Sequence, residues 1–167
     1  ADKNPNTQGL RLQGLAPNVG VDELIADAAA GRLAALVLHR TDLTTWRPGA
    51  ETQTALEKVP FLAVLDTDQR EACQFAAVVF PVATYAESDG TFTNHAGRVQ
   101  RFNPAVAPPG DARQGWFALA ELVTRVTGES LPPNADAVFA ALAADSAAFR
   151  SLSYAILGDR GQLAAGS

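Results

Sequence analysis

The stretch VVFPVATYAESDGTFTNHAGRVQRFN, residues 78–103, combines short apolar runs with the densest cluster of turn signals in the chain. Its first three residues, 78–80, predict a short apolar strand. Pro81 ends that strand, because proline has no N–H to donate to a sheet. Asp89-Gly90 predicts a tight turn, since glycine tolerates the positive φ that such a turn demands.

A second turn is predicted four residues further on, at residues 94–97 (NHAG). After it, residues 98–102 alternate polar and apolar side chains, as a strand with one buried face does. Two glycine-containing turns this close together indicate a backbone that something approaches closely.

Apolar runs and helical periodicity alternate upstream of this stretch. We expect, in order, a helix at 21–30, a buried strand at 33–38, a polar loop at 41–48, a helix at 50–58, a buried strand at 61–65, a short helix at 69–75 and a strand at 77–80. Strands separated by such short helices pair in parallel through right-handed crossovers. The predicted fold class is therefore α/β, a Rossmann-like parallel sheet with flanking helices and a C-terminal helical appendage.

The chain is expected to divide into four parts. They are an irregular N-terminal segment at residues 1–20, an α/β Rossmann-like domain at 21–106, a helical appendage at 107–157 and a frayed tail at 158–167. The first part is rich in Asn, Gly and Pro, and the appendage begins with a proline-rich linker. Helical spacing in the appendage predicts helices that end near residues 127, 144 and 157.

Composition excludes several classes of function. A net charge of −5 over 167 residues, with scattered Lys and Arg, argues against nucleic-acid binding. The single cysteine, Cys73, cannot supply an internal disulfide, a cysteine-rich zinc site or an iron–sulfur cluster. A helix needs about 20 apolar residues to span a bilayer, and no apolar run of this sequence approaches that length. No direct membrane insertion is therefore expected. The chain contains no methionine, and we expect it to be a fragment of something longer.

Few residues suggest catalysis. His39 follows a predicted strand, where sites form in parallel sheets, but nothing in the sequence pairs with it, and a structural or solvated histidine is favoured. Residues 66–68 (Asp-Thr-Asp) offer hard oxygen ligands for a cation, although a solvated strand end is the favoured interpretation. The motifs of nucleophile elbows and of phosphate-binding glycine loops are absent from the sequence. We therefore assign no catalytic residue and no metal ligand.

The two glycine turns leave two interpretations open. Their backbone N–H groups could form an anion-binding nest to which Arg98 and Arg101 add donors for phosphate. Alternatively, they belong to a solvent-facing hairpin in which Glu87 and Asp89 neutralise those arginines. The residue chemistry favours the hairpin.

The order of these residues resembles a family signature. Residues 76–81 (AAVVFP), 86–94 (AESDGTFTN) and 97–100 (GRVQ) are similar to the pattern ADVVLP … EKDGTFTN.EGRVQ of molybdopterin oxidoreductases, which include formate dehydrogenases and nitrate reductases. Residues 108–113 and Trp116 resemble a narrower group within that family. This group is the large iron–sulfur subunit of bacterial respiratory complex I, the G-type subunit of NADH:quinone oxidoreductase.

The resemblance implies a C-terminal structural domain of a larger subunit that supports respiratory electron transfer without its own redox centre. Iron–sulfur clusters would then lie on a preceding part, and complex I members of the family generally carry no molybdenum cofactor. Ala77 replaces the aspartate of the signature, which favours the cofactor-free interpretation. The implied partners are other subunits of the complex I hydrophilic arm, and the implied location is cytoplasmic, at the inner face of the membrane through the parent complex.

Two alternatives remain. If the chain belongs to a catalytic molybdopterin-dinucleotide enzyme, the residues that the resemblance places near the pterin are Gly90, Thr91, Asn94 and Arg98. The other alternative is a free-standing interaction module. An isolated lobe of this kind could also expose an apolar face and form a homodimer.

Overall fold

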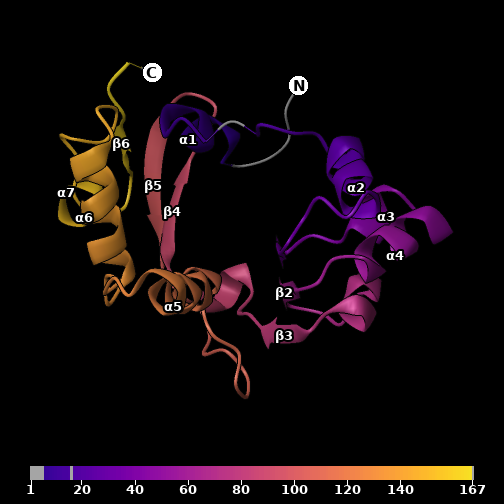
Figure 1. Cartoon of the computed structure of the whole chain (residues 1–167). Helices are drawn as coiled ribbons and strands as arrows, with labels where there is room; N and C mark the ends of the chain where they lie inside the picture. The colour runs from indigo at the N-terminus through magenta and orange to yellow at the C-terminus, as the bar shows by residue number, and fades with distance from the viewer. Residues whose placement is uncertain (1–5, 16, 167) are drawn as a thin grey trace. The chain divides into compact units, whose positions relative to one another are not determined.

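The computed structural model describes residues 6–15 and 17–166 (Figure 1). The described residues form two compact units, each assembled from separate stretches of sequence rather than from the contiguous parts expected. We call residues 17–84 and 108–118 the parallel unit. Residues 6–15, 85–107 and 119–166 are called the antiparallel unit.

The parallel unit contains a three-stranded parallel sheet in the order β1 (Leu36–His39), β2 (Leu62–Asp66) and β3 (Val78–Pro81). Its helices are α2 (Val21–Ala29), α3 (Leu43–Trp46), α4 (Ala50–Glu57) and the 3-10 helix η1 (Glu71–Phe75). The α/β class and the parallel pairing are therefore confirmed. Pro81 is the last residue of β3, as its missing N–H predicts.

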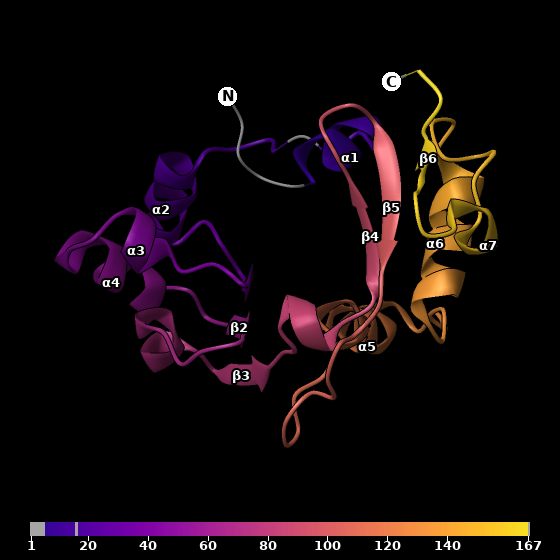
Figure 2. The ribbon, with the colours of Figure 1, turned by 180° about the vertical axis from the view of Figure 1, so that it is seen from behind.

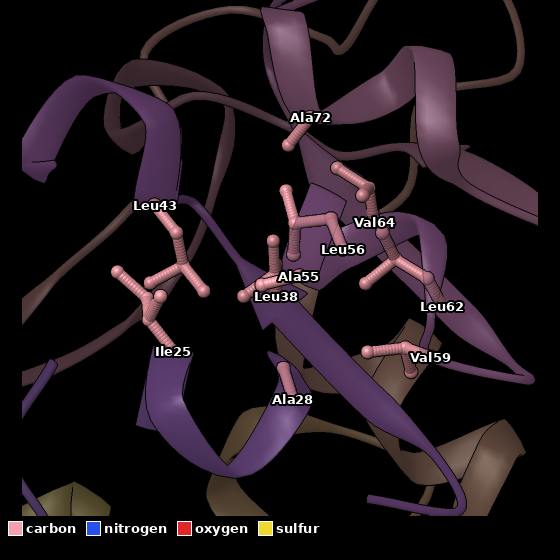
Figure 3. Packing of buried hydrophobic residues seen from close by; sticks show 10 residues of the cluster. All are labelled: Ile25, Ala28, Leu38, Leu43, Ala55, Leu56, Val59, Leu62, Val64 and Ala72. Atoms are coloured by element: carbon pink, nitrogen blue, oxygen red, sulfur yellow. The ribbon is translucent and has the colours of Figure 1, made fainter. Parts of the chain in front are cut away.

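An aliphatic core lies between these helices and the sheet (Figure 3). Side chains from α2, α3, α4 and η1 point toward residues of β1 and β2, and ten buried residues form this cluster: Ile25, Ala28, Leu38, Leu43, Ala55, Leu56, Val59, Leu62, Val64 and Ala72. Every residue of β2 is buried, as expected for the central strand.

The other two strands differ from the expectation of burial on both faces. β1 begins at Leu36 rather than at residue 33, and only Leu38 within it is fully buried. β3 exposes three of its four residues. The reason is position: both are outer strands of a three-stranded sheet, so each has a neighbour on one side only.

The prediction of a polar loop at residues 41–48 was wrong in part, because these residues include the one-turn helix α3. Asp42 caps that helix by accepting a hydrogen bond from the backbone N–H of Thr44.

The antiparallel unit contains β4 (Gly90–Thr93), β5 (Arg98–Phe102) and β6 (Gln162–Leu163), in that order. Around them lie α1 (Thr7–Leu12), the 3-10 helix η2 (Tyr85–Glu87), α6 (Ala135–Asp145) and α7 (Tyr154–Leu157). Figure 2 shows β4 and β5 as a hairpin, with β6, α6 and α7 beside β5. Helix α5 (Gly115–Thr127) begins in the parallel unit and ends in the antiparallel unit.

The hairpin turn is at residues 94–97, where Gly97 has φ of +74°. The prediction of a tight turn at Asp89-Gly90 was wrong, because Gly90 is the first residue of β4 and pairs with Phe102. The second predicted turn alone therefore makes the hairpin.

The antiparallel unit has its own core, rich in aromatic residues. Phe139 and Phe149 meet edge to face with ring centroids 6.3 Å apart, and Val99 of β5 is fully buried in the same cluster. α6 begins after Asn134, whose side chain accepts from the backbone N–H of Ala137, as the sequence predicts. The helix expected up to residue 157 is reduced to α7.

The end of the chain differs from the expected frayed tail at 158–167. Gln162 and Leu163 pair with β5, and the backbone N–H of Ala164 donates to the carbonyl of Gly97 at 2.9 Å. Residue 167 lies outside the described residues.

Within residues 6–15 and 17–166, no helix combines the length and the apolar character that crossing a membrane requires.

Candidate functional site

Two regions carry the polar groups that a ligand could use, and each lies within one unit. The first is the β4–β5 hairpin, which contains the four residues suspected from the sequence. Asn94 Oδ1 accepts hydrogen bonds from the backbone N–H groups of Ala96 and Arg98, both at 3.0 Å. Arg98 Nη1 donates to the carbonyl of Gly161 at 3.0 Å. Both side chains therefore hold the turn and the chain end in place.

The four suspected residues do not converge. In an antiparallel pair, side chains alternate between faces, so Gly90 and Arg98 share one face and Thr91 lies on the other. Gly90 is also four residues from Asn94, a separation of roughly 13 Å along a strand. A Cβ at position 90 would lie 3.0 Å from the ring of Phe102, so the glycine is explained by packing against that ring.

The arginines proposed for an anion nest have partners within their own unit. Arg98 is bound to Gly161, and the guanidinium of Arg101 lies 5.5 Å from the ring centroid of Tyr154. A cation above an aromatic face is attracted by the ring quadrupole. These contacts support the hairpin interpretation, although the neutralisation by Glu87 and Asp89 stays a prediction.

The second region is the carboxyl edge of the parallel sheet, where β1, β2 and β3 end. Ligands of open parallel sheets bind outside this edge. β1 ends at His39 and continues into Arg40, whose φ of +52° is unusual for a residue with a side chain. The backbone N–H of Arg40 donates to the carbonyl of Leu65, which holds this strained residue against β2.

Asp66 ends β2, and its side chain is 1% exposed. Its Oδ1 accepts from the backbone N–H of Thr67 at 2.7 Å. Its Oδ2 lies 3.1 Å from Nε of Arg70, but none of the described groups makes a well-aligned hydrogen bond to it. A buried carboxylate oxygen held only by an ion pair to a largely exposed arginine can still accept a donor. The solvated strand end expected at residues 66–68 is therefore corrected for Asp66.

Asp42 lies just beyond β1 and is 1% exposed. Its Oδ1 accepts from the backbone N–H and the hydroxyl of Thr44, at 2.8 and 2.7 Å, and its Oδ2 accepts from the backbone N–H of Ala72 at 3.2 Å. Asp42 thus joins α3 to η1 and supports the sheet edge, with its oxygens already used.

His39 lies against the start of α5. The imidazole fills the space beside Gly115, where a Cβ would overlap Nε2. Partial burial lowers the pKa of His39, the positive charge of Arg40 lowers this pKa further, and Asp66 raises it in part. The edge therefore brings together a histidine that favours its neutral form and a buried carboxylate beside exposed arginines.

Among the described residues, no group of three or more His, Cys, Asp or Glu side chains is arranged to hold a metal ion. Chemically, the carboxyl edge can accept N–H donors at Asp66 and donate to anions from its arginines. Sequence reasoning identified the strand end at Asp66 but not its burial, and it missed Asp42. A weak signal for Asp42 was present, because Asp is one of the preferred N-cap residues of helices.

Comparisons with known proteins match this chain over most of its length. The model of the molybdopterin oxidoreductase family matches residues 7–125. The alpha subunit of the NADPH-Fe(3+) oxidoreductase of Geobacter sulfurreducens is 41% identical over 78% of this chain and 16% of that protein. The alpha subunit of the F420-dependent formate dehydrogenase of Methanocaldococcus jannaschii is 32% identical over 67% of the chain and 17% of that protein.

The G-type subunit of the NADH-quinone oxidoreductase of Shigella flexneri is 32% identical over 60% of the chain and 11% of that protein. The chain thus spans less than a fifth of each of these three relatives.

Proposed function

The chain belongs to the molybdopterin oxidoreductase family, and from this premise we propose that it is a structural domain of a larger subunit in a multi-subunit electron-transferring oxidoreductase. In this proposal, redox centres lie on other parts of the subunit, and residues 1–167 carry none. The finer assignment that we propose is the large subunit of an NADH:quinone oxidoreductase of the complex I type. Its partners would be subunits of the hydrophilic arm, at the cytoplasmic face of the membrane.

One observation carries the proposal: the polar groups of the family signature stabilise the hairpin itself. Asn94 accepts two hydrogen bonds from its own turn, and Arg98 bonds the backbone of Gly161. Gly90 accommodates the ring of Phe102. Residues used in this way serve folding, which supports a structural role for this part of the family signature. The names of two relatives, which describe subunits, support a place in a larger assembly.

The test is metal and absorbance analysis of the purified chain of 167 residues. We expect no visible absorbance and no stoichiometric iron or molybdenum. Stoichiometric metal that survives gel filtration would contradict the proposal.

A second candidate function, binding part of a pterin dinucleotide, is favoured by the carboxyl edge rather than by the hairpin. The hairpin does not fit such a group, because the side chains of Asn94 and Arg98 are bonded within their own unit. Asp66 does fit, since its buried Oδ2 can accept an N–H donor of a nucleobase, and the exposed Arg40 and Arg70 can donate to phosphate. When bound, the cofactor would supply metal-centred redox chemistry, and these residues would hold its nucleotide end.

The two candidates differ in what Asp66→Ala does to a full-length subunit. Denaturation followed by oxidation releases a fluorescent pterin if the cofactor is present. If the domain is only structural, the wild type and Asp66→Ala release equal amounts of pterin, whether or not another part of the subunit holds the cofactor. Release by the wild type that falls in Asp66→Ala, but not in the matched variant Asp68→Ala, would establish the second candidate.

A further inference from the structure

The junction between β1 and α5 is unusually close. Gly115 is the first residue of α5, and His39 is the last residue of β1. A Cβ built on Gly115 would overlap His39 Nε2 and lie 3.0 Å from Cε1 and 3.4 Å from Cδ2. The imidazole therefore occupies the space that any side chain at position 115 would need. Both residues belong to the parallel unit.

Charge at this junction depends on the protonation of His39. The N-terminal end of a helix carries partial positive charge, because its first N–H groups have no partner within the helix. A neutral imidazole packs beside such groups without adding charge, whereas an imidazolium would place a positive charge against them. The charged groups that act on His39 are Arg40, which also opposes protonation, and Asp66, which favours it.

We propose that neutral His39 acts as a pH-sensitive latch that holds the first turn of α5 against the end of β1, and that protonation of the imidazole releases this turn. The closeness of the ring to Gly115 supplies the contact, and the helix end supplies the sensitivity to charge. α5 continues beyond this turn to Thr127, so the latch decides how firmly the start of the helix is held within the parallel unit.

The direction of the pH dependence follows from the lowered pKa of His39. The latch is fully formed above the unfolded pKa of histidine, about 6.5. It is lost as the pH falls through the lower pKa of the folded state. Acidification from neutral pH through the lowered pKa of His39 therefore opens the latch, and a return to neutral pH closes it.

Trp116 provides a direct readout, because it follows Gly115 in the first turn of α5. The chain has two tryptophans, and the other, Trp46, is 70% exposed. A Trp46→Phe variant therefore leaves Trp116 as the single tryptophan, which can be excited selectively over the two tyrosines. In this background we expect the Trp116 emission to shift to longer wavelength on acidification, with a midpoint below about 6.5.

Two substitutions of His39 separate the latch from general acid effects. His39→Gln keeps a neutral polar side chain, and we expect its emission to stay constant over the same pH range. His39→Lys carries a permanent charge, and its emission at neutral pH should match that of the acidified wild type. Far-UV circular dichroism checks that each variant is folded.

The latch is refuted if His39→Gln shows the wild-type transition, because another group would then be responsible. It is also refuted if the Trp116 emission of the His39-containing protein does not change on acidification. Gly115→Ala gives an independent check that does not alter His39. Its Cβ displaces the ring, so the emission should be shifted at all pH values. A Gly115→Ala protein with the unaltered wild-type transition would contradict the proposal.

Discussion

The two units of this chain use polar side chains in opposite ways. In the antiparallel unit, Asn94 and Arg98 bond the backbone of their own unit, and the core is aromatic. In the parallel unit, the core is aliphatic and the polar groups gather where strands end, with Asp42 and Asp66 both buried. The comparison teaches that residues of a family signature can be bonded within their own unit, while a less conspicuous strand end holds a buried carboxylate oxygen without a well-aligned donor among the described residues.

The substitutions with the largest expected effect test whether the two hydrophobic cores unfold separately. Phe149 and Leu56 are each 1% exposed, one in each core. Truncating a buried residue of this size to alanine costs about 2–5 kcal/mol, with phenylalanine toward the upper end. We expect Phe149→Ala to increase amide hydrogen exchange in the antiparallel unit and Leu56→Ala to increase it in the parallel unit.

Exposed neighbours provide matched controls for both substitutions. Arg150→Ala and Glu57→Ala should change stability by less than about 0.5 kcal/mol. If either core variant increased exchange equally in both units, the two units would unfold as one, and the comparison between them would fail.

The next effect concerns the buried carboxylate that joins α3 to η1. Asp42→Ala removes the acceptor for two backbone N–H groups and one hydroxyl. Buried donors left without partners are costly, so we expect a loss of about 2–3 kcal/mol in urea unfolding. Asp68→Ala, at an exposed site of the same unit, should have little effect. An Asp42→Ala protein as stable as the wild type would show that water replaces the carboxylate.

A smaller effect is expected in the hairpin turn. Asn94→Ala removes two hydrogen bonds to backbone N–H groups, which contribute about 1 kcal/mol each at most. Thermal unfolding should therefore show a loss of about 1–2 kcal/mol, whereas the exposed neighbour His95 should tolerate alanine. In a full-length subunit, a loss of bound cofactor without a loss of stability would instead indicate a ligand-binding role for Asn94.

The smallest effect concerns Tyr154. Burial raises the pKa of its hydroxyl, Asp89 raises it further, and Arg101 lowers it in part. A raised pKa means that its stabilising contribution is complete below about pH 10 and is lost as the pH rises through the folded-state pKa. No partner for this buried hydroxyl is present among the described residues. Tyr154→Phe should therefore change stability by less than about 0.5 kcal/mol at neutral pH.

The same substitution should also reduce the loss of stability above about pH 10, measured by urea unfolding at each pH. If Tyr154→Phe lost as much stability at alkaline pH as the wild type, the loss would have to come from other ionisable groups.

Local patterns predicted much of the fold. The β2 strand, α2, α4, α5 and α6 lie close to their expected positions, because apolar periodicity and capping residues are properties of short stretches. The errors have a different origin. β1 and β3 were expected to be fully buried, but burial depends on how many strands flank each one. The chain end was expected to fray, but its pairing with β5 depends on a partner that is distant in the sequence.

The candidate site was less predictable. Gly90, Thr91, Asn94 and Arg98 were grouped because they are close in the sequence and match a family pattern. The alternation of a strand separates Thr91 from the others, and the length of the hairpin separates Gly90 from the turn. In contrast, His39 and Gly115 meet although they lie far apart in the sequence, which no local pattern indicates.

The sequence by itself determined the α/β class, the parallel pairing and the family, because these depend on periodicity, turn residues and the order of a motif. Only the tertiary structure decided which polar groups are already bonded and which remain available. Burial and hydrogen-bond satisfaction are set by neighbours that are distant in the sequence. For this reason Asn94 and Arg98 of the signature are bonded within their own unit, and Asp66 at the sheet edge has an oxygen without a well-aligned donor among the described residues.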